Sequence, residues 1–332
     1  MKMRAIFLCD GDRYDSVFPE SIKSEISRDW DIKDVRYRTS DVGREDFSDV
    51  VAIFSTWGMP KLTEDDIKAY FPSLKYLFYA AGSVQPFARP FLNLGIKVFS
   101  AWQANAVPVA EYSVAQILLA TKGFFSLYPR KKKEAHEVLV AAKRHYKGNY
   151  GAKVAILGDG AIGSLVIEEL LRHKLEVWVF SITMTEERAR ELGVRLASLE
   201  EIFSECDVIS NHLANNEKTQ GIINRALIES MKPYTTFINT GRGAQVDEAA
   251  LADKLASDNT ISAALDVTFP EPPLPDSPLL RLDNVTLTPH IAGSDGYEVQ
   301  RMSQYMIDEY RRLFNGEPAL YEVSLEMLER MA

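Results

Sequence analysis

The sequence predicts an α/β protein with two doubly wound parallel sheets, and three observations support this fold class. Short apolar, strand-like runs alternate with polar, helix-compatible stretches, which is typical of parallel sheets with crossover helices. A length of 332 residues is sufficient for two domains. A hydrophobic content of 46% supports full cores, and 26% charged residues gives no sign of disorder.

The expected strands form an N-terminal and a C-terminal group. The first group comprises residues 4–8, 50–54, 76–79 and 97–99. The second group comprises residues 154–157, 176–180, 207–210, 236–239, 261–265 and 285–288. The runs are short and mostly apolar, as strands buried on both faces of a parallel sheet are.

Helices are expected between these strands. A long apolar helix is predicted from residue 105 to about 125. Ser198 followed by Glu201 forms a capping box that starts another helix, and Pro233 follows a helix that ends at Met231. Two further helices are predicted at residues 247–255 and at about 297–315.

Composition and charge exclude several classes of function. The net charge of −9 argues against a nucleic-acid-binding protein, which usually has a basic surface. The one basic run, residues 130–133, is expected to be a solvated helix start rather than a phosphate site. No apolar run approaches the ~18 residues that a membrane span needs. Cys9 and Cys206 form no metal or redox motif, so we predict no metal site and reduced thiols in a cytoplasmic protein.

A glycine-rich turn indicates dinucleotide binding. The expected strand 154–157 leads into Gly158, Gly160 and Gly163, which form the pattern G-x-G-x-x-G before an apolar, helix-spaced run. The first glycine permits the turn and the second lets the backbone approach a pyrophosphate. The third lets the helix pack on the strand. A glycine-rich turn without a ligand is the alternative.

Arg242, Glu271 and His290 each follow a strand-like apolar run. Ligands bind at the carboxyl ends of the strands of an open α/β sheet. There, an arginine can bind a carboxylate and polarise a neighbouring carbonyl. A histidine can hold or give a proton, and a carboxylate at its other nitrogen fixes its tautomer. This set suits redox chemistry of a 2-oxo or 2-hydroxy acid. Each residue also has an alternative interpretation when taken singly. Arg242 could form a surface ion pair, Glu271 could be an ordinary residue of a proline-flanked loop, and His290 could cap a strand.

The order of these motifs resembles that of the D-isomer-specific 2-hydroxyacid dehydrogenases. The resemblance runs from about Leu77 to Gly296 and is densest in residues 153–163 and 237–293. It implies a Rossmann NAD(P)-binding domain of residues 102–296, inserted in a flavodoxin-like substrate domain of residues 1–101 and 297–332. It also implies a homodimer to which the long helix contributes, although the residues alone equally support an ordinary buried helix.

The resemblance implies an oxidoreductase that transfers a hydride between a nicotinamide cofactor and a small 2-oxo or D-2-hydroxy acid. His290 would protonate the carbonyl oxygen during reduction and take the hydroxyl proton during oxidation. Glu271 would favour the imidazolium form of His290, and Arg242 would bind the substrate carboxylate and carbonyl together. The cofactor-binding residues implied are Gly158, Gly160, Ala161, Ile162, Gly163, Ser181, His212, Leu213, Thr240, Gly241, Arg242, Asp266, His290 and Gly293.

Two of these cofactor positions have more specific expectations. The loop that begins at His212 resembles the family's His-x-Pro loop, with Ala214 in place of the proline, and is expected to touch the cofactor without taking part in the chemistry. Asp266 is expected to contact the nicotinamide carboxamide.

Substrate contacts are expected at two further strand ends. Gly82 and Ser83 lie where the family has a small-residue turn, and their amides could hold a carboxylate. A plain tight turn is the alternative. Trp57 is expected to wall the pocket. Met59 stands near a position where some phosphoglycerate-type members carry arginine, which weakens a claim to a phosphorylated substrate.

Ser181 leaves the choice between NAD and NADP open. An NAD-binding member normally has Asp or Glu at the end of this strand to hold the ribose 2′-hydroxyl. Serine removes that carboxylate, but no Arg or Lys stands immediately beside it; Arg188 and Arg190 follow later. NADP is slightly favoured, or dual use.

Two alternative functions use the same fold. An NAD(H)-sensing, non-enzymatic binding protein would keep the glycine-rich turn, but the intact set of Arg242, Glu271 and His290 argues against it. A formate dehydrogenase has glutamine where this chain has Glu271. The fold alone does not separate these functions; the site residues do.

Overall fold

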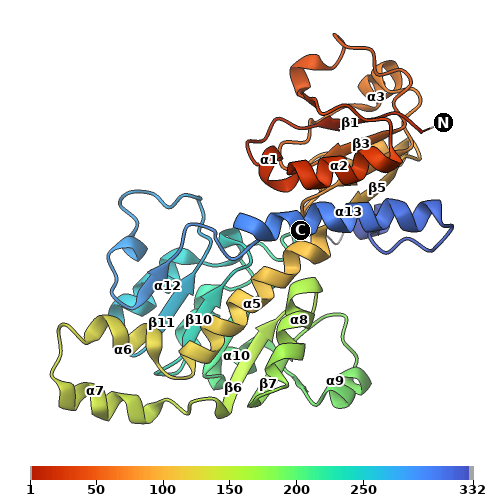
Figure 1. Ribbon diagram of the computed structural model, residues 1–332. Coiled ribbons are helices and arrows are strands. Elements are labelled where there is room, and N and C mark those ends of the chain that lie inside the picture. Colours follow the sequence, from red (N-terminus) through yellow and green to blue (C-terminus); the bar gives the residue numbers. More distant parts are fainter. Residues whose placement is uncertain (1, 329–332) are drawn as a thin grey trace. The chain divides into compact units, whose positions relative to one another are not determined.

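The computed structural model describes residues 2–328. The chain separates into two compact units, the first made of Met1–Asn105 with Ser294–Ala332 and the second of Ala106–Gly293. Each unit has its own sheet, with six strands in the first and seven in the second (Figure 1). The helix α5 (Trp102–Ala120) runs across the boundary in sequence.

The sheet of the first unit has the strand order β13-β5-β4-β3-β1-β2, and all neighbours pair in parallel except β13 and β5. Its strands are β1 (Ala5–Leu8), β2 (Arg36–Tyr37), β3 (Ala52–Ser55), β4 (Tyr76–Tyr79), β5 (Lys97–Ser100) and β13 (Glu322–Val323). Its helices are α1 (Tyr14–Val17), α2 (Glu20–Asp29), α3 (Glu64–Tyr70), α4 (Ala88–Asn93), α13 (Val299–Phe314) and α14 (Leu325–Leu328), with 3-10 turns η1 (Thr39–Asp41) and η5 (Gly296–Glu298).

Aromatic side chains fill the core of this first unit. Phe54, Phe78 and Phe99 stack across β3, β4 and β5 with ring centroids 5.1 Å apart in each neighbouring pair. Trp30 and Tyr310 cover the row edge-on, and Tyr310 brings α13 onto the sheet (Figure 1). Burial of such large rings is the main stabilising contribution that a small core can have.

The sheet of the second unit has the order β12-β11-β10-β9-β6-β7-β8 and is parallel throughout. Its strands are β6 (Tyr150–Leu157), β7 (Lys174–Phe180), β8 (Arg195–Leu196), β9 (Val208–Asn211), β10 (Thr236–Asn239), β11 (Ser262–Leu265) and β12 (Val285–Leu287). Its helices are α6 (Phe124–Arg130), α7 (His136–Ala142), α8 (Ala161–Leu170), α9 (Glu186–Leu192), α10 (Leu199–Glu205), α11 (Arg225–Ser230) and α12 (Glu248–Ser257), with 3-10 turns η2 (Lys143–His145), η3 (Gly243–Gln245) and η4 (Pro278–Leu280).

Helices cover both faces of this second sheet. Successive residues of a strand point to opposite faces, so Phe237 joins an apolar cluster with α10, α11 and α12, whereas Ile238 joins one with α5 and α8. Both faces are therefore buried, as in doubly wound folds. The predicted fold class, α/β with two doubly wound sheets, is confirmed.

Several boundaries and one local assignment differ from the prediction. The strand β6 begins at Tyr150 rather than at residue 154, and α5 spans 102–120 instead of 105–125. The chain turns at Gly123, whose φ of 75° is left-handed, before α6 begins. The basic run 130–133 was predicted to start a helix, but Arg130 is the last residue of α6. Positive charge at that end complements the helix dipole.

Candidate functional site

The glycine-rich turn joins β6 to α8 at the point where the strand order of the second sheet reverses. Gly158 has a φ of 93°, and a Cβ at this position would lie 2.9 Å from the carbonyl oxygen of His212. A Cβ on Gly163 would lie 1.9 Å from the carbonyl oxygen of Gly158, so helix and turn pack without space for a side chain. A switch point of this kind is where open α/β sheets bind ligands.

The turn leaves room for an anion beside its second glycine. A Cβ on Gly160 would meet no atom within 4 Å. Gly160 is also the N-cap of α8, where no side chain caps the helix, and Ala161 and Ile162 begin the first turn. Free backbone amides at a helix start favour a phosphate. These residues therefore fit the pyrophosphate of a dinucleotide.

His212 lies next to this turn, at the end of the neighbouring strand β9. Its ring is buried, and burial lowers its pKa to about 3, so the ring is neutral. The hydroxyl of Ser210 lies 2.8 Å from Nε2, while Nδ1 has no hydrogen-bond partner among the described residues. Because a buried polar atom without a partner is costly, Nδ1 is a fitting contact for a bound polar group.

Arg242, Glu271 and His290 follow β10, β11 and β12, which are neighbours in the parallel sheet. The three residues thus belong to loops at one edge of the sheet. The structure joins two of them directly, because Nδ1 of His290 lies 2.6 Å from Oε1 of Glu271. A carboxylate only accepts hydrogen bonds, so the proton of this bond is on Nδ1. Both side chains are exposed, and Nε2 makes no hydrogen bond within the described chain.

The backbone of His290 is held in an uncommon conformation. Its φ is 54°, in the left-handed region that a non-glycine residue seldom adopts. Asp266 holds it there: its carbonyl accepts from the His290 amide (3.1 Å), and its carboxylate accepts from the amides of Ile291 (2.8 Å) and Ala292 (2.9 Å). Thr288 donates to the same carboxylate at 2.6 Å. Strained backbone that the surroundings hold this firmly is typical of functional sites.

The engagement of Asp266 bears on its expected contact with the nicotinamide. Both carboxylate oxygens already accept hydrogen bonds from the His290 loop, and the side chain is buried. The structure therefore assigns Asp266 a positioning role, while a contact with the cofactor stays a prediction.

Three buried amide side chains, which the sequence analysis missed, hold the Arg242 turn. Asn239 accepts from the amide of Gly241 (3.0 Å) and donates to the carbonyl of Arg242 (3.2 Å). Gln245 accepts from the amide of Arg242 (3.2 Å) and donates to the carbonyl of Leu213 (3.0 Å). Asn211 donates to both side chains, at 3.0 Å and 2.8 Å. The network ties the Arg242 turn to the His212 loop. Asn211 and Asn239 are the last residues of β9 and β10. In the sequence, each is a polar residue at the end of an apolar run, and this pattern could have identified them.

Thr240, another predicted cofactor position, directly precedes this turn in sequence. Thr240 is buried, and its hydroxyl lies 3.1 Å from that of Ser113 in α5. The guanidinium of Arg242 donates to the carbonyl of Gly241 at 2.7 Å. Gly293 closes the second unit in sequence.

Glu248, also missed by the sequence analysis, connects α12 to the loop that carries Glu271. Its Oε1 accepts from the amide of Phe269 at 2.7 Å. Desolvation raises the pKa of Glu248 to about 7, opposed by that hydrogen bond. A Cβ on Gly243 would lie 2.1 Å from the carbonyl carbon of Thr268. The Arg242 turn and the Glu271 loop are thus packed directly on each other.

The predicted substrate-binding residues lie at strand ends of the first unit. Trp57 follows β3, and Gly82 and Ser83 follow β4, its parallel neighbour. The guanidinium of Arg13 lies 5.3 Å from the ring centroid of Trp57. A Cβ on Gly11 would lie 2.2 Å from the carbonyl oxygen of Trp57, so the loops after β1 and β3 are in close contact.

The remaining histidines and the cysteines have no part in this arrangement. His136, His145 and His173 are exposed. Cys9 and Cys206 are buried free thiols, and desolvation raises their pKa to about 11 and about 12. Within residues 2–328, no group of His, Cys, Asp and Glu could hold a metal ion. In the same range, no helix is long and apolar enough to cross a membrane.

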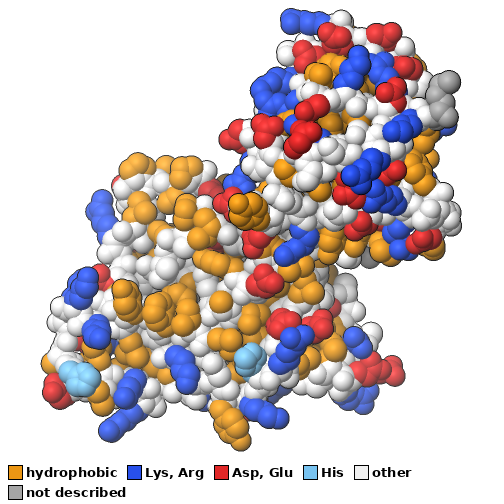
Figure 2. Space-filling view, viewed as in Figure 1, with side chains coloured by type: hydrophobic (Ala, Val, Ile, Leu, Met, Phe, Trp, Pro, Cys, Tyr) orange, Lys and Arg blue, Asp and Glu red, His pale blue; other side chains and the backbone are white. Residues whose placement is uncertain are grey.

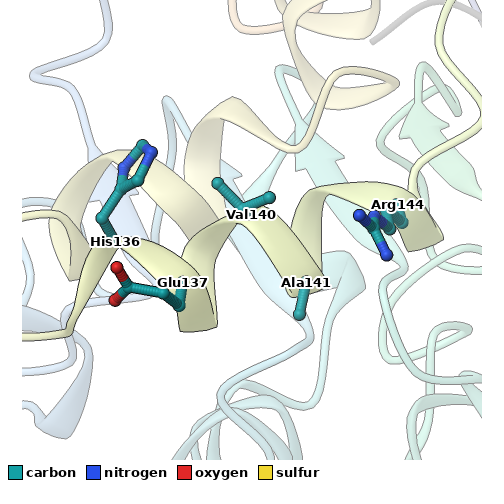
Figure 3. Close-up of a pocket in the computed structure, with 5 residues that line it drawn as sticks. All are labelled: His136, Glu137, Val140, Ala141 and Arg144. Atoms are coloured by element: carbon teal, nitrogen blue, oxygen red, sulfur yellow. The ribbon is translucent and has the colours of Figure 1, made fainter.

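A hollow on the surface of α7 is separate from these residues. His136, Glu137, Val140, Ala141 and Arg144 line it, and Figure 3 shows their side chains pointing in different directions from one helix segment. None of the predicted site residues is among them. The hollow therefore does not serve as the candidate site.

The chain belongs to the D-isomer specific 2-hydroxyacid dehydrogenase family. The family model described as "D-isomer specific 2-hydroxyacid dehydrogenase, NAD binding domain" matches residues 114–292. The chain is 31% identical over 236 residues to D-3-phosphoglycerate dehydrogenase of Archaeoglobus fulgidus, covering 71% of this chain and 44% of that protein. The corresponding enzyme of Escherichia coli is 32% identical over 238 residues, which cover 70% of this chain and 57% of that enzyme.

Solved structures show the same fold over almost the whole chain. A phosphoglycerate oxidoreductase from Rhizobium etli superposes with a TM-score of 0.81 at 20% identity, covering 98% of this chain and 100% of that one. The apo form of Rhodotorula graminis D-mandelate dehydrogenase gives a TM-score of 0.79 at 20% identity, covering 98% of each chain. The chain spans less than half the length of the Archaeoglobus relative.

Proposed function

We propose that this protein is an NAD(P)-dependent oxidoreductase that interconverts a small 2-oxo acid and a D-2-hydroxy acid. The observation that carries the proposal is the bond between His290 and Glu271, at the sheet edge that also bears Arg242 and the glycine-rich turn. The first unit would hold the substrate and the second unit the cofactor. Bound nicotinamide would supply or accept the hydride.

His290 is the proposed general acid and base. Glu271 fixes one proton on Nδ1, so that in the imidazolium form the second proton is on Nε2, which gives it to the carbonyl oxygen during reduction and leaves the neutral ring. In the oxidative direction, Nε2 takes the proton of the hydroxyl group. The carboxylate of Glu271 stabilises the imidazolium that this second direction forms. The firmly held backbone of His290 keeps the ring in position for both directions.

Arg242 is the proposed substrate anchor. Its planar guanidinium can bind the carboxylate of a 2-oxo acid and polarise the adjacent carbonyl. The buried amides that hold its backbone would orient it. Trp57, Gly82 and Ser83 in the first unit would contribute the remaining substrate contacts.

The cofactor residues proposed from the sequence suit a dinucleotide. Gly158, Gly160 and Gly163 shape the turn, and His212 offers an unpaired Nδ1 beside it. Two structurally similar proteins were crystallised with NADPH, an acyclic imino acid reductase and a D-isomer specific 2-hydroxyacid dehydrogenase from Xanthobacter autotrophicus. Both are below 25% identical to this chain, so they support the class of cofactor and leave the choice between NAD and NADP to its own residues.

A homodimer is proposed as the form in solution. Exposed apolar side chains occur at the end of α5 and in α6: Leu119 (43% exposed), Phe124 (40%) and Tyr128 (67%). Figure 2 shows hydrophobic side chains gathered over the region of α5 in the second unit. Contiguous exposed apolar surface is typical of protein–protein interfaces.

A substrate panel tests the proposed activity. The purified protein is assayed for oxidation of NADH and NADPH with glyoxylate, hydroxypyruvate and longer 2-oxo acids, and the products are analysed for D configuration. We expect turnover of at least one acid. Cofactor binding without turnover of any acid would favour the NAD(H)-sensing alternative instead.

A further inference from the structure

The carboxylate of Asp159, a residue of the glycine-rich turn, lies next to the end of β7. Asp159 is the residue between the first two glycines of the G-x-G-x-x-G turn. Its Oδ1 accepts from the hydroxyl of Ser181 at 2.6 Å. Thr183 donates to the same carboxylate, at 3.0 Å from Oδ1 and 3.2 Å from Oδ2. The turn and the end of the second strand of the unit therefore meet at Asp159.

Ser181 is fully engaged in holding this arrangement. Its hydroxyl oxygen accepts from the amides of Thr183 (3.0 Å) and Met184 (2.8 Å), while its proton goes to Asp159. The serine thus shapes the loop and orients the carboxylate. It does not offer an uncommitted hydroxyl to a ligand.

We propose that Asp159 discriminates between the two cofactors by binding the 2′-hydroxyl of the adenosine ribose, so that the protein prefers NAD(H) to NADP(H). The end of this strand is where Rossmann proteins place the acidic residue that holds this hydroxyl. Position 181 lacks that acid, but Asp159 brings a carboxylate to within hydrogen-bonding distance of it. The proposal rests on the proposed cofactor use and reverses the slight preference for NADP that Ser181 alone suggests.

The charges near Asp159 disfavour a 2′-phosphate. A phosphate would meet the carboxylate as a like charge. The two arginines that follow Ser181 in sequence are both committed within α9. Arg188 pairs with Glu191 at 3.0 Å, and Nε of Arg190 donates to the carbonyl of Glu186 at 3.3 Å.

The inference is tested by direct binding, without substrate. Dissociation constants for NADH and NADPH are measured by calorimetry for the wild type, Asp159→Asn and Asp253→Asn. Asp253 is an exposed aspartate in α12 that pairs with Arg225, so it controls for the loss of a surface charge. We expect the wild type and Asp253→Asn to bind NADH the more tightly. Asp159→Asn should lower the preference by roughly tenfold to a hundredfold, the effect of one charged hydrogen bond.

A second variant distinguishes the role of Ser181 from that of Asp159. Ser181→Ala leaves the carboxylate of Asp159 but removes a hydrogen bond that orients it. It should lower the preference for NADH less than Asp159→Asn does. Circular dichroism of each variant establishes folding. The ratio of the NADH and NADPH dissociation constants of the wild type tests the proposal even if Asp159→Asn does not fold.

The results distinguish this inference from the proposed function. Tighter binding of NADPH by the wild type, equal binding of both cofactors, or an unchanged ratio in Asp159→Asn would overturn the role of Asp159. The oxidoreductase would still stand if either cofactor bound and a 2-oxo acid was reduced. Failure of the wild type to bind either cofactor would overturn both.

Discussion

At the scale of single residues, the site depends on side chains that fix other side chains. Glu271 fixes the proton position on His290, and Asp266 fixes the backbone that carries the ring. Asn239 and Gln245 fix the backbone of Arg242 by hydrogen bonds. In the proposed mechanism, groups that are oriented in advance lose less entropy when the substrate binds.

His290→Gln tests the proton donor. We expect kcat for 2-oxo acid reduction to fall by roughly 10²–10⁴, the span typical for loss of a general acid. Cofactor dissociation constants should change little. The matched control is His173→Gln, since His173 is exposed and is not one of the predicted site residues. A near-normal kcat for His290→Gln would remove this residue from the mechanism.

Glu271 is tested with two variants that differ in what they keep. Glu271→Gln retains an oxygen that can accept from Nδ1 of His290 but removes the charge, whereas Glu271→Ala removes both. We expect both to lower kcat, with the larger loss in Glu271→Ala because the ring is then free to change tautomer. Steady-state kinetics at saturating 2-oxo acid measure the difference. Wild-type rates in Glu271→Ala would show that the bond to His290 has no catalytic role.

At the scale of elements, two glycines of the turn between β6 and α8 are predicted to affect different properties, one the stability of the protein and the other its affinity for the cofactor. Gly163→Ala forces a Cβ against the carbonyl of Gly158, so we expect destabilisation of about 1–3 kcal/mol. Gly160→Ala places its Cβ in open space, so the melting temperature should stay near that of the wild type. Its affinity for NADH should nevertheless fall, because the methyl group occupies the approach of the pyrophosphate. Thermal melts and calorimetric titrations compare the pair. Unchanged NADH affinity in Gly160→Ala would place the pyrophosphate elsewhere.

The contact between α12 and the Glu271 loop predicts a pH-dependent stability. Folding raises the pKa of Glu248 from 4.5 to about 7, so the folded state favours the protonated carboxyl. The stability contribution is complete below the unfolded pKa and is lost as the pH rises through about 7. Relative to Glu248→Gln, the wild type should therefore lose stability between pH 5 and pH 8. Urea unfolding of both proteins at the two pH values measures this. A constant difference between them would show that Glu248 is ionised throughout.

At the scale of the whole molecule, family membership and activity rest on different evidence. The family model covers residues 114–292, which is most of the second unit, and the structural matches cover nearly the full chain. The curated relative from Archaeoglobus is more than twice as long as the part that matches. The substrate panel therefore decides which acid this protein uses.

The proposed homodimer is also a property of the whole molecule. Tyr128→Glu puts a charge into the exposed apolar region at α6, and we expect it to shift the protein from dimer to monomer in light scattering at micromolar concentration. Tyr150→Glu, at a tyrosine of the same unit that is 78% exposed, should leave the dimer intact. A wild type that is monomeric under these conditions would contradict the proposal.

The sequence by itself determined the alternation of strands and helices, the cofactor turn and the three candidate catalytic residues. These features are local: each depends on the spacing of apolar residues or on a residue type next to a strand end. It missed the two-residue strands β2, β8 and β13, because such short elements exist only through pairing with a neighbour.

Only the tertiary structure decided which residues support the site. Asp159 and Ser181 are 22 positions apart, and Asn211 and Gln245 are 34 apart. Parallel strands bring such distant positions together at one edge of the sheet. A pattern of neighbouring residues in the sequence does not predict this proximity. Position 181, taken alone, slightly favoured NADP, whereas the preference for NAD that we propose rests on the hydrogen bond between Ser181 and Asp159. The charge that a ligand meets is set by neighbours in space, and these follow from strand order and register.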